Sequence, residues 1–459
     1  MSASPSTAAS GAETRRFGRS AAILSLGIGT TGLITYAYFS LASYSLSEHD
    51  YGGVTLLWSA IFVTVSVLYR PVEQLLSRTI ADRQARARRG YEHLRVAATI
   101  QLTLGAVFVV AALALRGPLQ DGLLGGRHAL YWILIVAVLA YAASYFARGF
   151  LAGNHRFGLY GALVLMESVS RCLFALAVAI GIASGQVAVA VGMAAAPIVS
   201  LSVVPWALGG RLRRLPPIRS ASMPHEFRAT QSPGTSADAL DSSAEARPGA
   251  EPEFSLAHGT GFAVAVLLIM LSEQSFLNAG PLLVKATEGA GGAALAGFTF
   301  NALLIARAPL QLFQAVQTSI LPHLTRARVS GEVDSFRRSV NVTLAAIAAF
   351  AGAVALAMLV AGPFVMGVVF GGSFDYARGG LVLVSLGMGL YLSAATLNQA
   401  LLARGLARRA AAAWAASAAA FVAFLLLPGF DDRVLQVETG YLGGALLLCS
   451  LLYALYRRG

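Results

Sequence analysis

The sequence predicts an all-α membrane protein with about 12 transmembrane helices in two six-helix lobes. Composition is the first observation, because the 459 residues are 56% hydrophobic and only 12% charged, whereas soluble domains carry roughly 25% charged residues. The charged residues also lie in short clusters between apolar runs of about 18 residues or more, the length that crosses a bilayer. Lipid offers no hydrogen-bond partners, so such runs form helices. They are too long and too uniformly apolar for the alternating strands of a membrane barrel.

The apolar runs form two sets of expected spans. The first set lies near residues 21–42, 52–75, 96–115, 129–150, 159–183 and 187–208, and the second near residues 256–277, 293–321, 340–360, 380–402, 410–427 and 441–456. We therefore expect a cytoplasmic tail (1–20), an N-terminal lobe (21–210) and a C-terminal lobe (256–459). Residues 211–255 are rich in Pro, Ser, Ala and charge, which indicates a disordered cytoplasmic linker. The length of the first run indicates an uncleaved signal-anchor.

Basic residues predict the orientation of these spans. Of the 34 basic side chains, 27 lie in the tail, the linker and the connections of one side, 5 lie on the other side and 2 lie within spans. The positive-inside rule then places both termini and the linker in the cytoplasm. Arginine outnumbers lysine 33 to 1, which suggests a GC-rich bacterial genome, so we expect the chain in the bacterial cytoplasmic (inner) membrane. Because the net charge of +12 is distributed between spans, it does not indicate nucleic-acid binding. Cys172 and Cys449 lie far apart in apolar runs, so we expect no disulfide, metal or cofactor.

The two halves of the chain resemble faint repeats of each other. The segment that begins at Tyr51 (Tyr-Gly-Gly-Val-Thr-Leu-Leu) aligns with the one that begins at Leu295 (Leu-Ala-Gly-Phe-Thr-Phe-Asn) at an offset of 244. Two Gly-rich apolar helices also align by chance, so this observation is suggestive alone. Internal repeats are typical of transporters, whose sites lie near the midplane at the repeat interface.

Four segments in order carry a resemblance to a known family. They are Ala147-Arg-Gly-Phe-Leu-Ala-Gly-Asn-His-Arg-Phe-Gly-Leu-Tyr-Gly, Arg307-Ala-Pro-Leu-Gln-Leu-Phe-Gln-Ala-Val-Gln-Thr-Ser-Ile-Leu-Pro-His-Leu-Thr-Arg, Phe370-Gly-Gly-Ser-Phe and Asn398-Gln-Ala-Leu-Leu-Ala-Arg-Gly. The chain resembles the polysaccharide-biosynthesis (O-antigen-type) flippases of the multidrug/oligosaccharidyl-lipid/polysaccharide (MOP) exporter superfamily. No single motif is specific, and the resemblance depends on the order and spacing of all four.

The resemblance implies two six-helix lobes around a central cavity that opens alternately to each side of the membrane. The implied cargo is a polyprenyl-diphosphate-linked oligosaccharide, a precursor of cell-surface polysaccharide. Expected partners are this lipid-linked saccharide, membrane lipids, a coupling ion (proton or sodium), a polysaccharide polymerase and glycosyltransferases. Lipid II flippases are relatives, but the first expected span carries no charged residue here, which disfavours a lipid II role.

Ionisable side chains within spans are the candidate site residues, because each costs roughly 2.5–3.5 kcal/mol to insert unless it is paired or hydrated. Arg307 lies about 14 residues, roughly 20 Å, into its expected helix. Gln311, Gln314 and Thr318 follow on the same helix face. A guanidinium binds phosphate oxygens bidentately, so this polar stripe predicts contact with a diphosphate. The alternative is that Arg307 pairs with Glu273 to hold two helices together.

Three further pairs of polar or charged residues lie in the two expected lobes. Glu273 and Gln274 lie in the polar stretch Ser-Glu-Gln-Ser within an apolar run, which suggests either a hinge or ion site at an interrupted helix or a counter-ion for Arg307. Glu167 and Arg171 are spaced i,i+4, so we expect them to pair on one helix face, with a cavity-lining role as the alternative. Arg70 and Glu73 are interpreted as residues near a helix end that reach the lipid headgroups.

Three other functions compete with the flippase. A proton- or sodium-coupled small-molecule (multidrug-type) exporter of the same fold is the main alternative. A membrane enzyme is disfavoured because the longest expected outer loop spans only residues 361–379, and the sequence has no nucleophile elbow, zinc cluster or phosphate-binding loop. A transport-inactive scaffold that recruits partners through the linker is disfavoured by the charged residues within spans.

Overall fold

The computed structural model describes residues 29–85, 92–205, 256–289, 291–305, 333–371 and 376–458. Side chains at 85, 256–263, 333–336 and 403 are outside this description. The described part consists of helices and connecting turns and contains no strand, which confirms the all-α prediction. In this part, nine helices are long and apolar enough to cross a membrane, and residues 292–305 form a shorter apolar helix.

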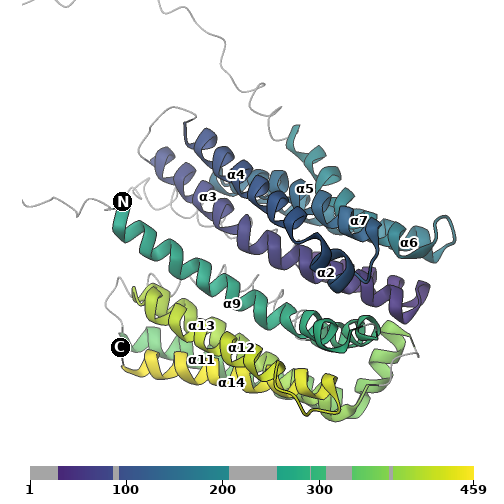
Figure 1. Ribbon diagram of the computed structural model, residues 1–459. Helices are drawn as coiled ribbons and strands as arrows, with labels where there is room; N and C mark the ends of the chain where they lie inside the picture. The colour runs from purple at the N-terminus through teal and green to yellow at the C-terminus, as the bar shows by residue number, and fades with distance from the viewer. Residues whose placement is uncertain are drawn as a thin grey trace, which may run out of the picture.

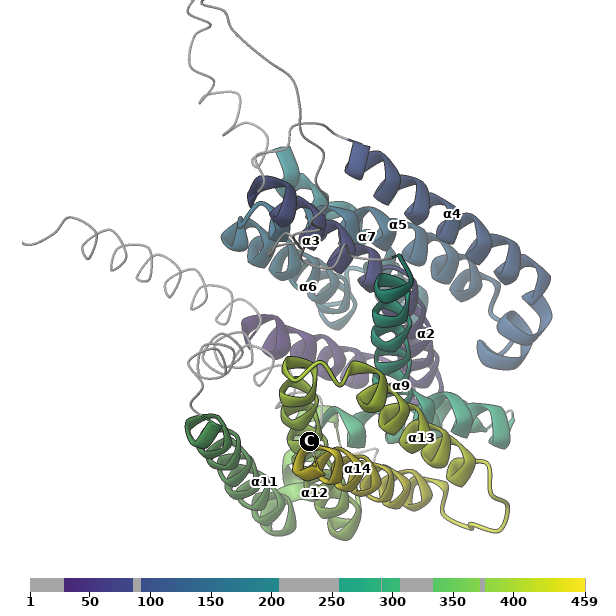
Figure 2. The same ribbon diagram turned by 90° about the vertical axis from the view of Figure 1, so that its left-hand side faces the viewer.

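The helices form two groups (Figure 1). The first contains a helix over residues 29–45, α2 (Glu48–Leu68), α3 (Arg70–Ala85), α4 (Glu92–Ala114), a π-helix (Pro118–Leu123), α5 (His128–Gly153), α6 (Phe157–Ala179), α7 (Gly185–Ser200) and a 3-10 helix (Leu201–Val203). The second contains α9 (Leu256–Glu288), the helix over 292–305, α11 (Val333–Phe370), α12 (Arg378–Ala403), α13 (Ala407–Leu425) and α14 (Arg433–Arg458). Helices α2 and α9 pack together between the two groups, as the rotated view in Figure 2 also shows.

Several helices extend beyond their predicted bounds. Helix α11 continues to Phe370 and α12 begins at Arg378, so most of the expected outer loop over 361–379 is helical. Helix α14 begins at Arg433, before its expected span. Helix α3 continues to Ala85, ten residues beyond the expected end. Helices α2 and α3 are separated at Tyr69, because Pro71 has no N–H to continue the helical hydrogen bonds. The next turn is regular, since Glu73 N donates to Tyr69 O at 3.0 Å.

Helix α9 is continuous through the polar stretch, so the predicted interruption is wrong. Ser272 Oγ donates to Leu268 O at 2.8 Å, and Ser275 Oγ donates to Leu271 O at 2.9 Å. Serine hydroxyls that bond to the preceding turn need no other partner. The stretch therefore presents Glu273 and Gln274 on an unbroken helix.

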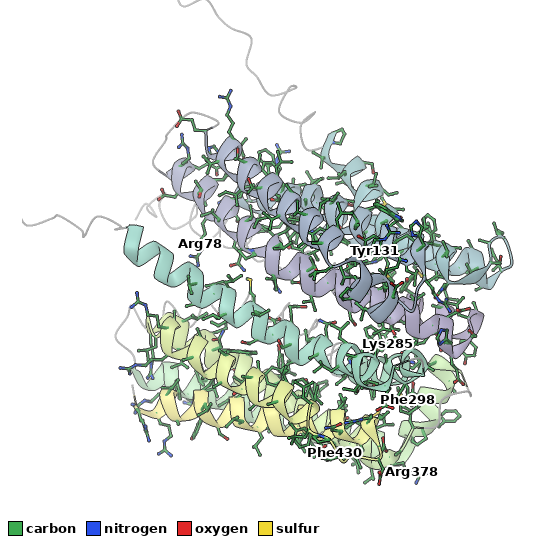
Figure 3. All side chains as sticks on the ribbon, viewed as in Figure 1. Arg78, Tyr131, Lys285, Phe298, Arg378 and Phe430 are labelled. Carbon is green, nitrogen blue, oxygen red and sulfur yellow. The ribbon has the colours of Figure 1, made fainter. Side chains whose placement is uncertain are left out.

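Polar and glycine contacts join the two groups near one end of the bundle. Ser40 Oγ donates to Val369 O at 2.5 Å, Ser43 Oγ donates to Phe370 O, and Tyr44 OH donates to Val368 O at 2.7 Å. We call these contacts, with those of α2 on the 292–305 helix, the outer junction. Figure 3 shows Arg378 at this end, predicted to face outward, and Arg78 at the opposite end, predicted to be cytoplasmic.

Helix α2 and the helix over 292–305 approach closely in the outer junction. Tyr51 OH donates to Asn301 Oδ1. A Cβ on Gly297 would lie 3.1 Å from Gly52 Cα, a tight contact that would push the two helices slightly apart. A Cβ on Gly52 would overlap the Ala293 carbonyl. The contacting segments are those that the sequence aligns at an offset of 244, so the aligned parts of the two halves meet at this point.

Replacing Gly52 by alanine is expected to destabilise this closed arrangement by about 1–3 kcal/mol, because the new methyl group overpacks the junction. Gly352→Ala is the matched control, since nothing lies within 4 Å of a Cβ at that helical position, and alanine there is expected to gain up to about 1 kcal/mol. Thermal unfolding of both variants in lipid nanodiscs checks this. Equal stability of the two variants would show that the close approach is absent.

Candidate functional site

A cavity of about 440 Å³ lies between the two groups of helices, within the range of about 300–1,000 Å³ that is usual for ligand sites. It is bounded by the helix over 29–45, α2, α3, α5 and α6 on one side and by α9 and the 292–305 helix on the other. Six charged side chains line it: Arg70, Glu73, Arg148, Glu167, Arg171 and Glu273. Charges at this depth are retained where they border water or a polar ligand.

The positions of the charged residues within their helices show where the cavity lies along the length of the bundle. Glu273 lies near the middle of α9, whereas Arg70 begins α3 and Arg148 lies in the last two turns of α5. Both of these helix segments run toward the end that carries Arg78. The outer junction closes the other end, so the polar cavity extends from the middle of the bundle toward its predicted cytoplasmic end.

Glu167 is held by three neighbours from two other helices. Arg148 forms an ion pair with it, Ser144 Oγ donates to its Oε1, and Ser200 Oγ lies 3.5 Å from the same oxygen. Only 2% of the Glu167 side chain is exposed. The predicted Glu167–Arg171 pair is therefore wrong, because α5 supplies a closer cation that sequence spacing on α6 does not reveal.

Arg171 has neutral partners instead of a carboxylate. Its Nη1 donates to Tyr141 OH at 2.8 Å and its Nη2 donates to Ser168 Oγ at 3.0 Å. The guanidinium carbon lies 4.7 Å from the ring centroid of Trp58 and 5.6 Å from that of Phe62. A guanidinium has five N–H donors, so Arg171 keeps donors for an anionic ligand while the two rings hold the guanidinium in place.

A weaker charge pair connects the two lobes inside the cavity. Arg70 Nη1 lies 4.0 Å from Glu273 Oε1, and 34% of the Arg70 side chain is exposed. Tyr160 OH donates to Glu73 Oε1 at 3.0 Å. The interpretation of Arg70 and Glu73 as headgroup-reaching residues is wrong, because they line the cavity. The cause is the length of α3, which continues about 22 Å beyond Arg70.

The structure brings four of the eight predicted site residues together. Glu167, Arg171, Glu273 and Gln274 all line the cavity, and Gln274 Oε1 accepts from Asn278 Nδ2 at 3.1 Å. The other four, Arg307, Gln311, Gln314 and Thr318, lie outside the described residues, and their stripe remains a prediction. Arg307 follows shortly after the 292–305 helix, whose Leu304 reaches the cavity.

Three cavity residues were missed as site residues in the sequence. Arg148 was counted among the basic residues of a cytoplasmic connection, and Arg70 and Glu73 were assigned to a helix end. The available signal was the sequence around Arg148, where Ala147, Gly149 and Phe150 continue the apolar run on both sides of the charge.

Solved structures over nearly the full length share this fold at low sequence identity. An inward-facing multidrug resistance MATE family transporter of the MOP superfamily matches with a TM-score of 0.64 and 13% identity, over 95% of this chain and 97% of that one. An outward-facing member matches with a TM-score of 0.57, 13% identity and coverage of 96% and 94%. The Vibrio cholerae MATE transporter VcmN in its bent form gives 0.56, 16% identity and coverage of 96% and 98%.

No protein-family model matches the sequence, and neither does any curated protein. The structural matches are with transporters, and they cover both groups of helices. They show the fold, and the superfamily and the polysaccharide-flippase assignment remain hypotheses. The chain therefore has the fold seen in these MATE transporters, and nine helices of its described part are long and apolar enough to cross a membrane.

Proposed function

We propose that this protein is an alternating-access flippase that moves a polyprenyl-diphosphate-linked oligosaccharide across the bacterial cytoplasmic membrane. The observation that carries the proposal is Arg171, a buried arginine in the inter-lobe cavity whose partners are neutral. Arginine binds phosphate oxygens through two parallel N–H donors and is preferred where such planar recognition matters. An anionic headgroup therefore supplies the negative counter-charge that the Arg171 guanidinium lacks.

The remaining lining suits the other parts of such a cargo. Glu273, Gln274 and Asn278 offer hydrogen-bonding groups to saccharide hydroxyls. The cavity has room for a headgroup, and the polyprenyl tail stays among the lipid tails. Binding of the diphosphate also competes with Glu273 for Arg70, which weakens the charge pair between the lobes.

Transport follows from exchanging one closed end for the other. In this conformation the outer junction is closed, so cargo enters from the predicted cytoplasmic side. Binding draws Arg70 and Arg171 of the first lobe and the polar side chains of α9 around one headgroup. Closure there and opening of the outer junction then deliver the headgroup to the outer face, where a polysaccharide polymerase uses it after glycosyltransferases have built it in the cytoplasm.

A proton- or sodium-coupled small-molecule exporter is the second candidate. Three carboxylates, Glu73, Glu167 and Glu273, line the same cavity, and the structural neighbours are described as multidrug transporters. An organic cation would bind to these carboxylates, whereas a diphosphate would bind to the arginines. The coupling ion would compete with such a cargo for the same oxygens.

Reconstitution of the full chain in liposomes separates the two functions. The probe is a fluorescent saccharide on a polyprenyl diphosphate, and its transfer is measured by cleavage with a membrane-impermeant glycosidase. The same saccharide on an uncharged polyprenyl carrier is the matched control. We expect transfer of the diphosphate-linked probe alone. Transfer of both carriers alike, or transport only of a cationic dye under an ion gradient, would contradict the flippase.

A further inference from the structure

Glu438 is a buried carboxylate that the cavity does not use. Glu438 lies on α14 and is 5% exposed. Within the described part of the chain, its carboxylate has no hydrogen-bond donor and no cation as a partner. The sequence analysis placed this position in an outer connection, because the last expected span begins at Tyr441. The structure instead begins α14 at Arg433 and turns Glu438 into the lobe.

Helix α12 forms the other wall of this position. The Glu438 carboxylate packs against Gly380, the third residue of α12, and a Cβ on Gly380 would overlap it. Gly387 continues the same contact, since its Cβ would lie 2.7 Å from Tyr441. The two helices thus meet through glycines at the very place where the acid is buried.

The charged groups around Glu438 are engaged elsewhere. Asp432 is exposed and accepts from the backbone N–H groups of Val434 and Leu435. Arg433 donates to Glu288 of α9 at 2.9 Å. Lys285 of α9 donates to Gly289 O, and Arg378 of α12 is exposed. Helix α13 contributes the rings of Phe421 and Phe424 to its contact with α14 near Gly440. These surroundings provide Glu438 with no counter-ion.

An ionised carboxylate buried without a partner costs several kcal/mol, and the neutral acid avoids that cost. The packed α12–α14 contact therefore suits a protonated Glu438. Water is nearby, because Glu438 is five residues from the start of α14, or about 8 Å along the helix. That start carries the exposed Asp431 and Asp432 and lies at the end predicted to face outward.

We propose that Glu438 is a proton-binding site in the second lobe, filled from the outer side and separate from the central cavity. The carboxylate takes one proton from water and becomes the neutral acid that packs against Gly380. Release of that proton to water restores the carboxylate, which requires α12 and α14 to part at their outer ends. Proton binding thereby favours the arrangement described here, so the pH on the outer side sets the balance between the packed and the parted outer ends of α12 and α14.

Infrared spectroscopy of the full chain in liposomes tests the site without any cargo. The difference spectrum between wild type and Glu438→Gln is expected to contain the carbonyl band of one protonated carboxylic acid at neutral pH. That band declines about tenfold per pH unit above its midpoint. Glu288→Gln is the matched control, since Glu288 is exposed and paired with Arg433, and its difference spectrum lacks the band at neutral pH.

Gly380→Ala provides a second variant, because its methyl group displaces the carboxyl into water and removes the same band. Glutamine matches the neutral acid in shape, so Glu438→Gln is expected to unfold at the wild-type temperature. A wild-type spectrum in which Glu438 is ionised at neutral pH would overturn the proposal.

Transport assays then test whether protonation of Glu438 is coupled to the movement of the helices, an inference that rests on the proposed function. Acidifying the outer side holds the outer ends of α12 and α14 together, so it is expected to slow transfer of the diphosphate-linked probe by wild type and to leave the Glu438→Gln rate unchanged. An equal response in both proteins would refute the coupling while the infrared band persists. Absence of transfer by wild type under every gradient would instead refute the flippase.

Discussion

Replacing Arg171 by alanine is expected to weaken binding of the diphosphate-linked saccharide strongly. A hydrogen bond to a charged group contributes about 1.5–3 kcal/mol, so the loss of one or more such bonds lowers affinity roughly ten- to several hundredfold. Lysine retains the charge but not the planar pair of donors, so Arg171→Lys is expected to bind with intermediate affinity. Isothermal titration of the purified variants in nanodiscs with the probe measures these affinities.

Arg404→Ala is the matched control for this experiment. Arg404 also stacks on an aromatic ring, with its guanidinium carbon 4.7 Å from the centroid of Tyr456, and it donates to Tyr456 O at 2.7 Å. It does not line the cavity. We expect Arg404→Ala to bind the probe with the affinity of wild type. An equal loss in both variants would assign the effect of Arg171→Ala to general destabilisation.

Breaking the Arg148–Glu167 pair from either side is expected to destabilise the protein by about 3–5 kcal/mol, because the remaining charge is left buried and unpaired. The double variant Arg148→Ala/Glu167→Ala removes both charges and is expected to lose less than the two single variants together. Thermal unfolding of the four proteins forms a double-mutant cycle that isolates the coupling.

Asp50 and Arg127 provide the comparison pair. They also lie in contact, at 2.6 Å, but their side chains are 32% and 28% exposed. Exposed ion pairs couple by about 0.2–1 kcal/mol, so the same cycle on this pair is expected to give a small value. Additive effects at Arg148 and Glu167 would mean that Glu167 is stabilised by its serine partners alone.

Most of the fold was predictable because membrane spans are coded by the length of apolar runs. The ends of the helices were not, since a helix that leaves the bilayer continues through polar residues. Helix α3 runs through Arg78 and Asp82, and α14 begins eight residues before its expected span. The expected break at Glu273 failed for a related reason, because serine hydroxyls satisfy themselves within a helix.

Part of the site was predictable because charges inside apolar runs are conspicuous. Glu167, Arg171 and Glu273 were found in this way, and Gln274 was found as the neighbour of Glu273 in the same polar stretch. Arg148 was not, because a basic residue near the end of a run also serves as a topology signal. The ion-pair partner of Glu167 could not be predicted from the sequence, because the Arg148–Glu167 pair depends on how α5 packs against α6.

Distances between spin labels test the central claim, an inter-lobe cavity whose two ends open in alternation. One pair joins exposed positions of the two lobes at the outer end, Asp121 and Arg378, and another joins Arg95 and Arg408 at the opposite end. The labels are attached to cysteines at these positions in a chain whose Cys172 and Cys449 are replaced by serine, and distances are measured by electron–electron double resonance in liposomes. Adding the diphosphate-linked saccharide is expected to lengthen the first distance and shorten the second. Two distances that stay fixed, or that change in the same direction, would contradict alternating access.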